Sequence, residues 1–354
     1  MSVGDSGDWV FPVLDAQAAD RAAERQHVLT KPRKSLGRLE ELPEQLAAIQ
    51  GDVLPKARPA AAILFAADHP VCVHGVSAYP SEVTAAMIRN FVTGGAAASV
   101  AARALDIALH IVDVGVAHPY GEVDGAAASI FVDPVSSERE GDIRTEDALS
   151  SETLARAMAA GARAVDRLAP DTRVLLLGEM GIGNTTLASA MACALLGADA
   201  SDLVGPGTGV ADAQLETKRA VVSDALARLD DGSPRGILRT LGGREVAALY
   251  GAAARACERR MVVMVDGFIV SVAMLALARA HPETRGHFVF AHRSREPGHQ
   301  AVLEALDARP LLDLSMALGE ASGAFAAFPI VELACRLHAG MATFDEAGVP
   351  DKEP

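Results

Sequence analysis

The chain contains 354 residues, of which 50% are hydrophobic, and its formal net charge is −14. A chain of this length can bury a sizeable core in one large domain or in two ordinary ones. Its basic residues are scattered among acidic ones, whereas binding to a nucleic-acid backbone requires clustered Lys and Arg. We therefore expect a globular protein that does not bind nucleic acid.

The cysteines and the N-terminal segment predict the compartment. The first ten residues lack the basic and apolar regions of a secretory signal. Neither a disulfide framework nor a zinc knuckle is expected from the four cysteines, because they are far apart and lack CxxC spacing: Cys72, Cys193, Cys257 and Cys335. These features predict a reducing compartment, the cytoplasm.

The first predicted elements are helical. Residues 13–49 have an amphipathic helical pattern that breaks around Lys31-Pro32. The segment 31–42, KPRKSLGRLEEL, lies at this break. Its basic residues could bind an anion, and a solvated helix start explains them equally well.

Six apolar runs follow, with alanine-rich helical patterns such as 85–105 and 152–168 between them. Each run is continuously apolar rather than alternating, which is typical of strands that are buried on both faces of a parallel sheet. The sequence therefore predicts a doubly wound, mainly parallel α/β sheet with strands at 61–66, 108–114, 129–132, 174–177, 261–265 and 287–291.

The stretch 261–278 approaches the length of a membrane span. Asp266 and Gly267 interrupt it, so a buried strand followed by a helix is the favoured interpretation and no membrane partner is expected. Residues 318–341 are again helical. We expect the chain ends, 1–54 and 311–354, to form a small helical domain beside a large Rossmann-like domain of residues 55–310.

The most informative segment is LGEMGIGNTTLASAM, residues 177–191. An apolar strand leads to Glu179, glycines follow at 181 and 183, and a helical pattern begins near Thr185. Glycines allow a sharp turn and close approach of a ligand, and the free N–H groups of a helix start attract an anion. The glycine order matches neither GxGxxG nor the P-loop, and a tight turn without a ligand is the alternative. Glu179 favours a ligand site, because packing poorly explains a carboxylate at the end of a buried strand.

Two later segments resemble parts of ligand sites. VGPGTG, residues 204–209, is followed by Lys218 on a predicted helix. It is either a second phosphate cradle with a positive charge beside it or a plain loop. Asp266 ends a strand and Gly267 opens a turn, so the carboxylate could bind ribose hydroxyls or cap the next helix.

Histidines after two of the strands are candidates for metal binding or catalysis. Asp68, His69 and His74 follow the first strand, but their spacing fits no helix-borne zinc motif. Hydrogen bonding is therefore the favoured role and no metal is expected. His292 follows the last strand and is either a general base or a structural hydrogen-bond donor, of which we favour the second.

Glu320 lies in LGEASGA, residues 318–324, where its neighbours are small or apolar. Such neighbours remove water from a carboxylate and raise its basicity. Glu320 is therefore a candidate general base.

Eight strings in the sequence, in this order and spacing, resemble the nicotinate-nucleotide:dimethylbenzimidazole phosphoribosyltransferases of cobalamin biosynthesis. They are KPRKSLGRLEEL, ADHPVCVHGVSAYP, TGGAAA, LGEMGIGNTT, GPGTG, DGFI, AHRSREPGH and LGEASGA, and the resemblance extends over nearly the whole chain. The resemblance implies transfer of the phosphoribosyl group of nicotinate mononucleotide to 5,6-dimethylbenzimidazole, which gives α-ribazole 5′-phosphate and nicotinate. It also implies a doubly wound sheet with a small helical domain, a homodimer and no cofactor.

The chemistry of that reaction agrees with the acids present. The pyridinium of nicotinate mononucleotide leaves as a neutral ring, so neither a general acid nor a metal is required. The attacking benzimidazole must lose its other N–H proton, which requires one base. The resemblance assigns this role to Glu320, contributed by the small helical domain, and places Glu179 in the same pocket to bind the base or support oxocarbenium-like charge. A single in-line displacement then inverts the anomeric carbon.

The resemblance further implies the substrate contacts. The aromatic acceptor would touch Tyr79, Met87 and Leu318. The phosphate and ribose would contact both glycine turns, the lysine and the strand-end acid, namely Gly181, Ile182, Gly183, Asn184, Thr185, Gly207, Thr208, Gly209, Lys218, Asp266 and Gly267. In two departures, Pro70 replaces a usual glycine, and Met87 stands where some members carry glutamine. The choice among benzimidazoles, purines and phenolics therefore stays open.

Two other functions are less consistent with the sequence. A dinucleotide-dependent oxidoreductase would show GxGxxG after its first strand, where this chain has ADHPV. A non-catalytic or altered-acceptor member that only binds nucleotide or base would keep the glycine turns and lose the acids. Both Glu179 and Glu320 are present, which favours the transferase.

Overall fold

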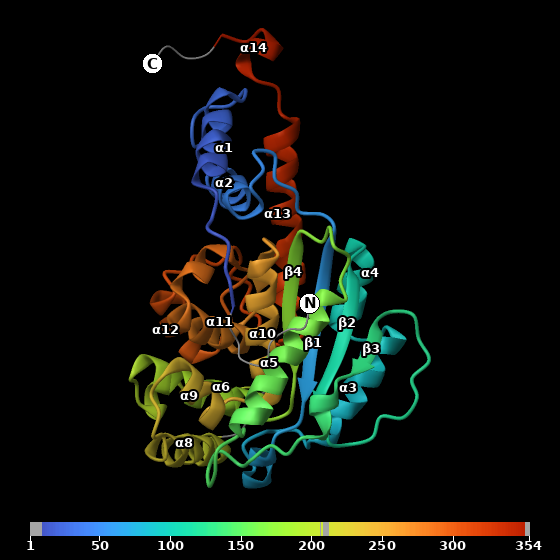
Figure 1. The fold of residues 1–354 in the computed structure, drawn as a ribbon, viewed down its shortest axis with the longest axis vertical. Helices are drawn as coiled ribbons and strands as arrows, with labels where there is room; N and C mark the ends of the chain where they lie inside the picture. Colours follow the sequence, from blue (N-terminus) through green and yellow to red (C-terminus); the bar gives the residue numbers. More distant parts are fainter. Residues whose placement is uncertain (1–8, 206, 208–211, 351–354) are drawn as a thin grey trace.

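The structure is a computed structural model that describes residues 9–205, 207 and 212–350. Within these residues six parallel strands form one sheet in the order β3-β2-β1-β4-β5-β6 (Figure 1). This confirms the predicted doubly wound fold and all six predicted strands. The strands are β1 (Ala60–Ala67), β2 (Ala108–Gly115), β3 (Ser129–Val132), β4 (Val174–Met180), β5 (Val262–Val265) and β6 (Phe288–Phe290).

The central strands are continuously apolar because both of their faces are covered. In β1, Ile63 and Phe65 pack into one buried cluster, while Leu64 and its even-numbered neighbours pack into another. The first cluster lies against helices on one side of the sheet and the second against helices on the other. Successive side chains of a strand point to opposite faces, so each residue of β1 has an apolar partner layer.

Two layers of helices cover the sheet. On one side α5 (Ser151–Asp166), α10 (Arg244–Glu258) and α11 (Phe268–Ala280) contact the strands. The same buried cluster extends outward through α6 (Asn184–Leu196), α7 (Ala200–Leu203), α8 (Asp212–Ala227), α9 (Pro234–Leu241) and α12 (Pro297–Ala305). The other face packs against α2 (Arg38–Gln50), α3 (Glu82–Thr93), α4 (Ala97–Leu105) and α13 (Ser322–Gly340). The remaining elements are α1 (Ala16–Val28), α14 (Phe344–Ala347), η1 (Pro70–His74), η2 (Pro134–Ser137) and η3 (Pro282–His287).

The prediction of one helix over residues 85–105 was wrong. Gly94 and Gly95 divide this stretch into α3 and α4. Gly94 has φ of 95°, a left-handed conformation that glycine adopts without steric cost, and its N–H bonds to the carbonyl of Asn90 to close α3. The break directs the N-terminus of α4 toward the carboxyl edge of the sheet, where it meets Glu320.

The helices α1, α2, α13 and α14 from the two terminal parts of the chain gather at one end of the molecule (Figure 1). A buried hydrogen bond of 2.8 Å joins Gln26 of α1 to His338 of α13, whose other ring nitrogen bonds to the carbonyl of Val53. Leu46 of α2 and Phe328 of α13 also belong to the cluster that covers one face of the sheet. The division into domains 55–310 and 1–54 with 311–354 stays a prediction.

In the described part of the chain, every helix is too short or too polar to span a bilayer.

The strand order places a topological switch beside β1. The chain moves outward from β1 to β2 and β3, then returns to form β4 on the other side of β1. The loops that leave β1 and β4 therefore run in opposite directions and open a crevice at the carboxyl ends of the strands, which is where sheets of this type bind ligands.

Candidate active site

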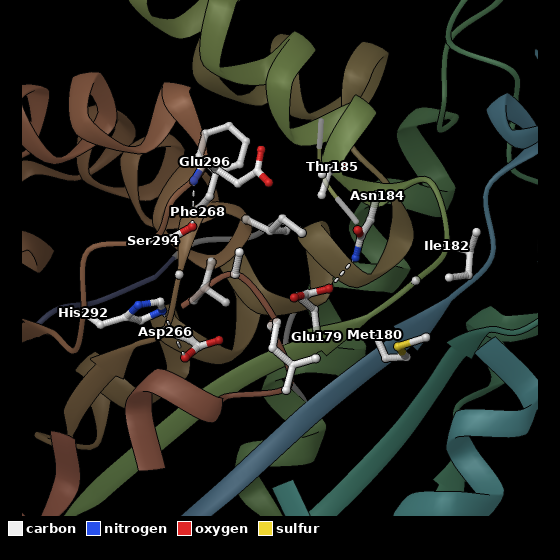
Figure 2. Close-up of a pocket in the computed structure, with 18 residues that line it drawn as sticks. Glu179, Met180, Ile182, Asn184, Thr185, Asp266, Phe268, His292, Ser294 and Glu296 are labelled. Carbon is white, nitrogen blue, oxygen red and sulfur yellow. Dashed lines mark hydrogen bonds and ion pairs between the residues drawn. The ribbon is translucent and has the colours of Figure 1, made fainter. Parts of the chain in front are cut away.

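A cleft of about 690 Å³, partly open to solvent, lies at the carboxyl ends of β4 and β5 (Figure 2). Its walls come from the β4–α6 turn, the start of α11, the loop before α12 and the segment before α13. The lining residues that were selected from the sequence are Glu179, Gly181, Ile182, Asn184, Thr185, Gly207, Asp266, Gly267, His292 and Leu318.

The other selected residues lie around this cleft or outside the described chain. Lys218 lies behind the wall, with its Nζ 2.9 Å from Oγ1 of Thr185. Gly183 caps α6. Tyr79 is 52% exposed and, like Met87, does not line the cleft. Thr208 and Gly209 lie outside the described residues.

Two glycines allow the β4–α6 turn to pass close to the loop after β1. A Cβ at Gly181 would lie 2.6 Å from the carbonyl oxygen of Ala67, and one at Gly183 would lie 2.6 Å from Sγ of Cys72. Gly183 also has φ of 93°, which side chains disfavour. The turn therefore needs glycine at both positions, and it places the start of α6 beside the cleft, where the positive end of the helix dipole would stabilise an anion.

Glu179 ends β4 inside the cleft, and the amide of Asn184 donates a hydrogen bond to it (Figure 2). Burial raises the pKa of Glu179 to about 8, with further increases from the nearby Asp266, Glu245 and Glu320, and the Asn184 bond opposes these effects. The carboxyl is therefore largely protonated at neutral pH when no ligand is bound. A cationic ligand would favour the ionised form and lower this pKa.

Replacement of Glu179 by Gln should stabilise the folded protein at high pH. A carboxyl with pKa near 4.3 in the unfolded chain and about 8 in the fold reduces stability progressively as pH rises from about 4 to about 8. Glutamine removes this loss, which amounts to at most about 5 kcal/mol. The melting temperatures of wild-type protein and Glu179→Gln, measured at pH 5 and at pH 8, test this effect. The variant should gain more over wild-type protein at pH 8 than at pH 5, and an equal gain at both pH values would contradict the prediction.

Asp266 lies at the end of β5, and its Oδ1 accepts a hydrogen bond of 3.0 Å from the N–H of Ala324. Burial raises its pKa to about 7, although backbone N–H groups oppose the shift. The closest histidine nitrogen is Nε2 of His292, at 3.8 Å. Burial lowers the pKa of His292, so the ring is neutral and packs against Gly323 at the start of α13. His292 itself lines the cleft, and its buried Nδ1 has no hydrogen-bond partner among the described residues, so the choice between general base and structural donor stays a prediction.

Glu320 is only 5% exposed and adopts φ of 61°, a left-handed conformation uncommon for glutamate. Its Oε2 is buried and has no hydrogen-bond partner among the described residues. Burial raises its pKa, and the N–H of Ala98 at the start of α4 opposes this shift. Such strain and an unsatisfied carboxylate oxygen are typical of functional positions.

Glu320 lies next to the cleft but does not line it. Leu318 and Gly319, which precede it, do line the cleft. A Cβ on Gly319 would approach Oε1 of Glu179 to 2.5 Å, so the two acids flank one short segment of backbone. The charge of Glu320 also raises the pKa values of Glu179 and Asp266. The three carboxyls therefore form one electrostatic group beside the cleft.

His69 lies between two buried glutamates. Its Nδ1 lies 2.7 Å from Glu140 and its Nε2 lies 3.2 Å from Glu245, both fully buried. Burial opposes the charged form, but the two glutamates raise the pKa of His69 well above its usual value. In the described residues no group of three or more His, Cys, Asp or Glu side chains is arranged to hold a metal ion.

Pro70 takes the first position of η1. A proline is well tolerated there, since this position needs no N–H and suits the fixed φ of proline.

Several lining residues were missed by the sequence analysis. Phe268, Ser294 and Glu296 all line the cleft, and Met180 forms part of its wall (Figure 2). Ser294 and Glu296 belong to the polar loop 291–299, from which only His292 was selected. The density of polar residues after the last strand was the available signal, but it did not indicate which side chains turn inward.

The fold and the cleft together define an α/β enzyme with its candidate site at the carboxyl ends of the strands of a parallel sheet. The family model described as "Phosphoribosyltransferase" matches residues 11–349. The chain belongs to this phosphoribosyltransferase family.

Named proteins are similar to this chain over nearly its full length. A nicotinate-nucleotide–dimethylbenzimidazole phosphoribosyltransferase of Pseudomonas aeruginosa is 48% identical over 348 residues, with 96% of each chain covered. One of Bradyrhizobium sp. is 46% identical, with 98% of this chain and 99% of the relative covered. A solved structure of the Thermus thermophilus enzyme has a TM-score of 0.88 at 40% identity, and the match covers 96% of this chain and 100% of that one.

Proposed function

We propose that this phosphoribosyltransferase moves the phosphoribosyl group of nicotinate mononucleotide to 5,6-dimethylbenzimidazole or a related base, and releases nicotinate. The observation that carries the proposal is the pairing of three buried carboxyls with an anion site across one cleft. Glu179 and Asp266 line the cleft, Glu320 adjoins it, and Lys218 supports its opposite wall. A substrate with a phosphate at one end and a cationic glycosidic centre at the other matches this distribution of charge.

In this proposal the phosphate of the substrate binds at the wall of the cleft formed by the start of α6 and Lys218. The N–H groups that begin α6 and the ammonium of Lys218 bind phosphate oxygens. Lys218 is 1% exposed, and burial lowers its pKa to about 8, so it is still charged at neutral pH. A buried cation that is still charged binds an anion strongly because little water screens the interaction.

The three carboxyls on the other side of the cleft stabilise the anomeric carbon during the reaction and remove a proton from the attacking base. As the bond to nicotinate breaks, positive charge spreads over the anomeric carbon and the ring oxygen, and Glu179 and Asp266 favour that charge. Glu320 takes the proton from the second nitrogen of the attacking benzimidazole. Its raised pKa makes the carboxylate a better base than an exposed glutamate.

The displacement is proposed to occur in one step with inversion. The leaving nicotinate and the attacking base occupy opposite faces of the sugar, so β-linked substrate gives α-linked product. The anomeric proton coupling of the product tests this: a β-linked product would indicate two displacements and a covalent intermediate.

The proposed function is tested by incubating the chain with nicotinate mononucleotide and dimethylbenzimidazole and measuring both products. Equimolar nicotinate and α-ribazole 5′-phosphate are expected. Nicotinate released without a benzimidazole product would indicate hydrolysis, and binding of both ligands without turnover would support a base-binding role instead.

A homodimer, a cytoplasmic location and the two-domain division are further parts of this proposal. Support for the dimer and the domains comes from the family resemblance. The mass of the protein in solution, measured by light scattering, tests the homodimer, and the mass of a monomer would contradict it.

A further inference from the structure

Within the described residues, the ammonium of Lys218 has one hydrogen available for a ligand. Its Nζ donates to Oγ1 of Thr185 at 2.9 Å and to the carbonyl oxygen of Gly205 at 3.1 Å. An ammonium carries three hydrogens, so two are used by these neighbours. Thr185 lines the cleft, and the third hydrogen is therefore held at its wall.

Glu296 faces the same corner from the loop before α12. It lines the cleft, and Figure 2 shows it on the same side as Thr185. Its Oε2 would lie 2.6 Å from a Cβ on Gly205, the residue whose carbonyl accepts from Lys218. The N–H of Gly207 favours the charged form of this carboxylate. Lysine and glutamate thus approach one short stretch of backbone from two sides.

Lys218 and Glu296 do not pair directly. Each influences the pKa of the other, yet no ion pair within 4.0 Å joins them in the described structure. Thr185, which Lys218 contacts from behind, and Glu296 both line the cleft, so the corner between them suits a group that accepts one hydrogen bond and donates another. A fully ionised anion lacks the donor, and its charge would be repelled by the carboxylate.

A phosphate that carries one proton has both properties. Its ionised oxygens accept from Lys218 and from backbone N–H groups, and its O–H donates to a carboxylate. Sulfate has nearly the same shape but carries no proton near neutral pH. A carboxylate next to the anion site therefore distinguishes phosphate from sulfate by the proton that phosphate carries rather than by size.

We propose that Glu296 accepts a hydrogen bond from the protonated phosphate of the substrate, so that the site binds this phosphate as its monoanion and rejects sulfate. This inference rests on the proposed function, which supplies the phosphate. Glu296 thereby determines specificity without taking part in bond cleavage. Burial raises the pKa of its carboxyl, which makes it a stronger proton acceptor than an exposed glutamate.

Titration calorimetry of the full chain with inorganic phosphate and with sulfate at pH 6 tests the proposal. Phosphate carries at least one proton at this pH, whereas sulfate carries none. Loss of a hydrogen bond to a charged group lowers affinity about ten- to hundredfold, so wild-type protein should bind phosphate tighter than sulfate by that factor. In Glu296→Gln the amide donates to either anion, and the two affinities should become similar.

Two further variants serve as controls. Glu304→Gln makes the same charge change on an exposed side chain of α12, which pairs with Gln300, and should retain the preference for phosphate. Lys218→Met should lose affinity for both anions. Thermal unfolding of each variant checks that it is folded, and the wild-type affinity ratio tests the proposal even if Glu296→Gln does not fold.

Each result has a defined consequence. Equal affinities in wild-type protein, or a preference for phosphate that survives in Glu296→Gln, would overturn the role of Glu296. The phosphate assignment itself would stand in those cases, provided that Lys218→Met loses both anions. If wild-type protein binds neither anion, the role of Glu296 and the proposed phosphate site are both wrong.

Discussion

The Glu320→Gln variant is expected to fold normally and to turn over about 10²–10⁴-fold more slowly than wild-type protein, the usual contribution of a general base. Glutamine keeps the size of the side chain but cannot accept the benzimidazole proton. The backbone at this position is left-handed and the side chain is buried, so an isosteric replacement disturbs the site least. Initial rates of nicotinate release with dimethylbenzimidazole as acceptor measure the effect.

A matched control lies on the helix that follows. Glu332 of α13 pairs with Arg58 at 2.8 Å and does not line the cleft, so Glu332→Gln should leave turnover unchanged. The binding of nicotinate mononucleotide to Glu320→Gln should also be nearly normal. Near-normal turnover in Glu320→Gln would remove the proton-transfer role of Glu320.

The Lys218→Met variant is expected to raise the KM for nicotinate mononucleotide at least about tenfold, and up to about a hundredfold, with little change in the KM for the base. Methionine fills the buried space but supplies no charge or hydrogen-bond donor. In wild-type protein the same KM should rise above about pH 8, where the ammonium loses its proton. The variant should lose this pH dependence.

Arg219→Met provides the comparison for Lys218→Met, since it removes a positive charge from the next position of α8, where Arg219 pairs with Glu216. We expect its KM values to match those of wild-type protein. Equal increases of both KM values in Lys218→Met would show that the lysine supports the whole site rather than the phosphate.

The central strands were predictable from the sequence because their burial on two faces makes them continuously apolar. Their order in the sheet was not, since the pairing of β1 with both β2 and β4 joins segments that are far apart in the chain. The break between α3 and α4 had a local signal in Gly94-Gly95, but the alanine-rich pattern around it masked that signal. Local periodicity thus indicates the type of element better than its limits.

The site was predictable where one short segment contains both strand end and turn. Glu179, Asn184 and Asp266 meet in the cleft because parallel strands present their carboxyl ends at one edge. The buried partners of His69 could not be found in this way. Glu140 follows β3 and Glu245 begins α10, and only the tertiary fold brings them to one histidine.

The most direct test of the account is a crystal structure of the protein with dimethylbenzimidazole and nicotinate mononucleotide bound to Glu320→Gln. We predict that a ring nitrogen of the base lies within hydrogen-bond distance of residue 320 and that the anomeric carbon lies between the base and nicotinate. A base bound away from residue 320, with Glu179 or His292 as its only polar neighbour, would contradict the account.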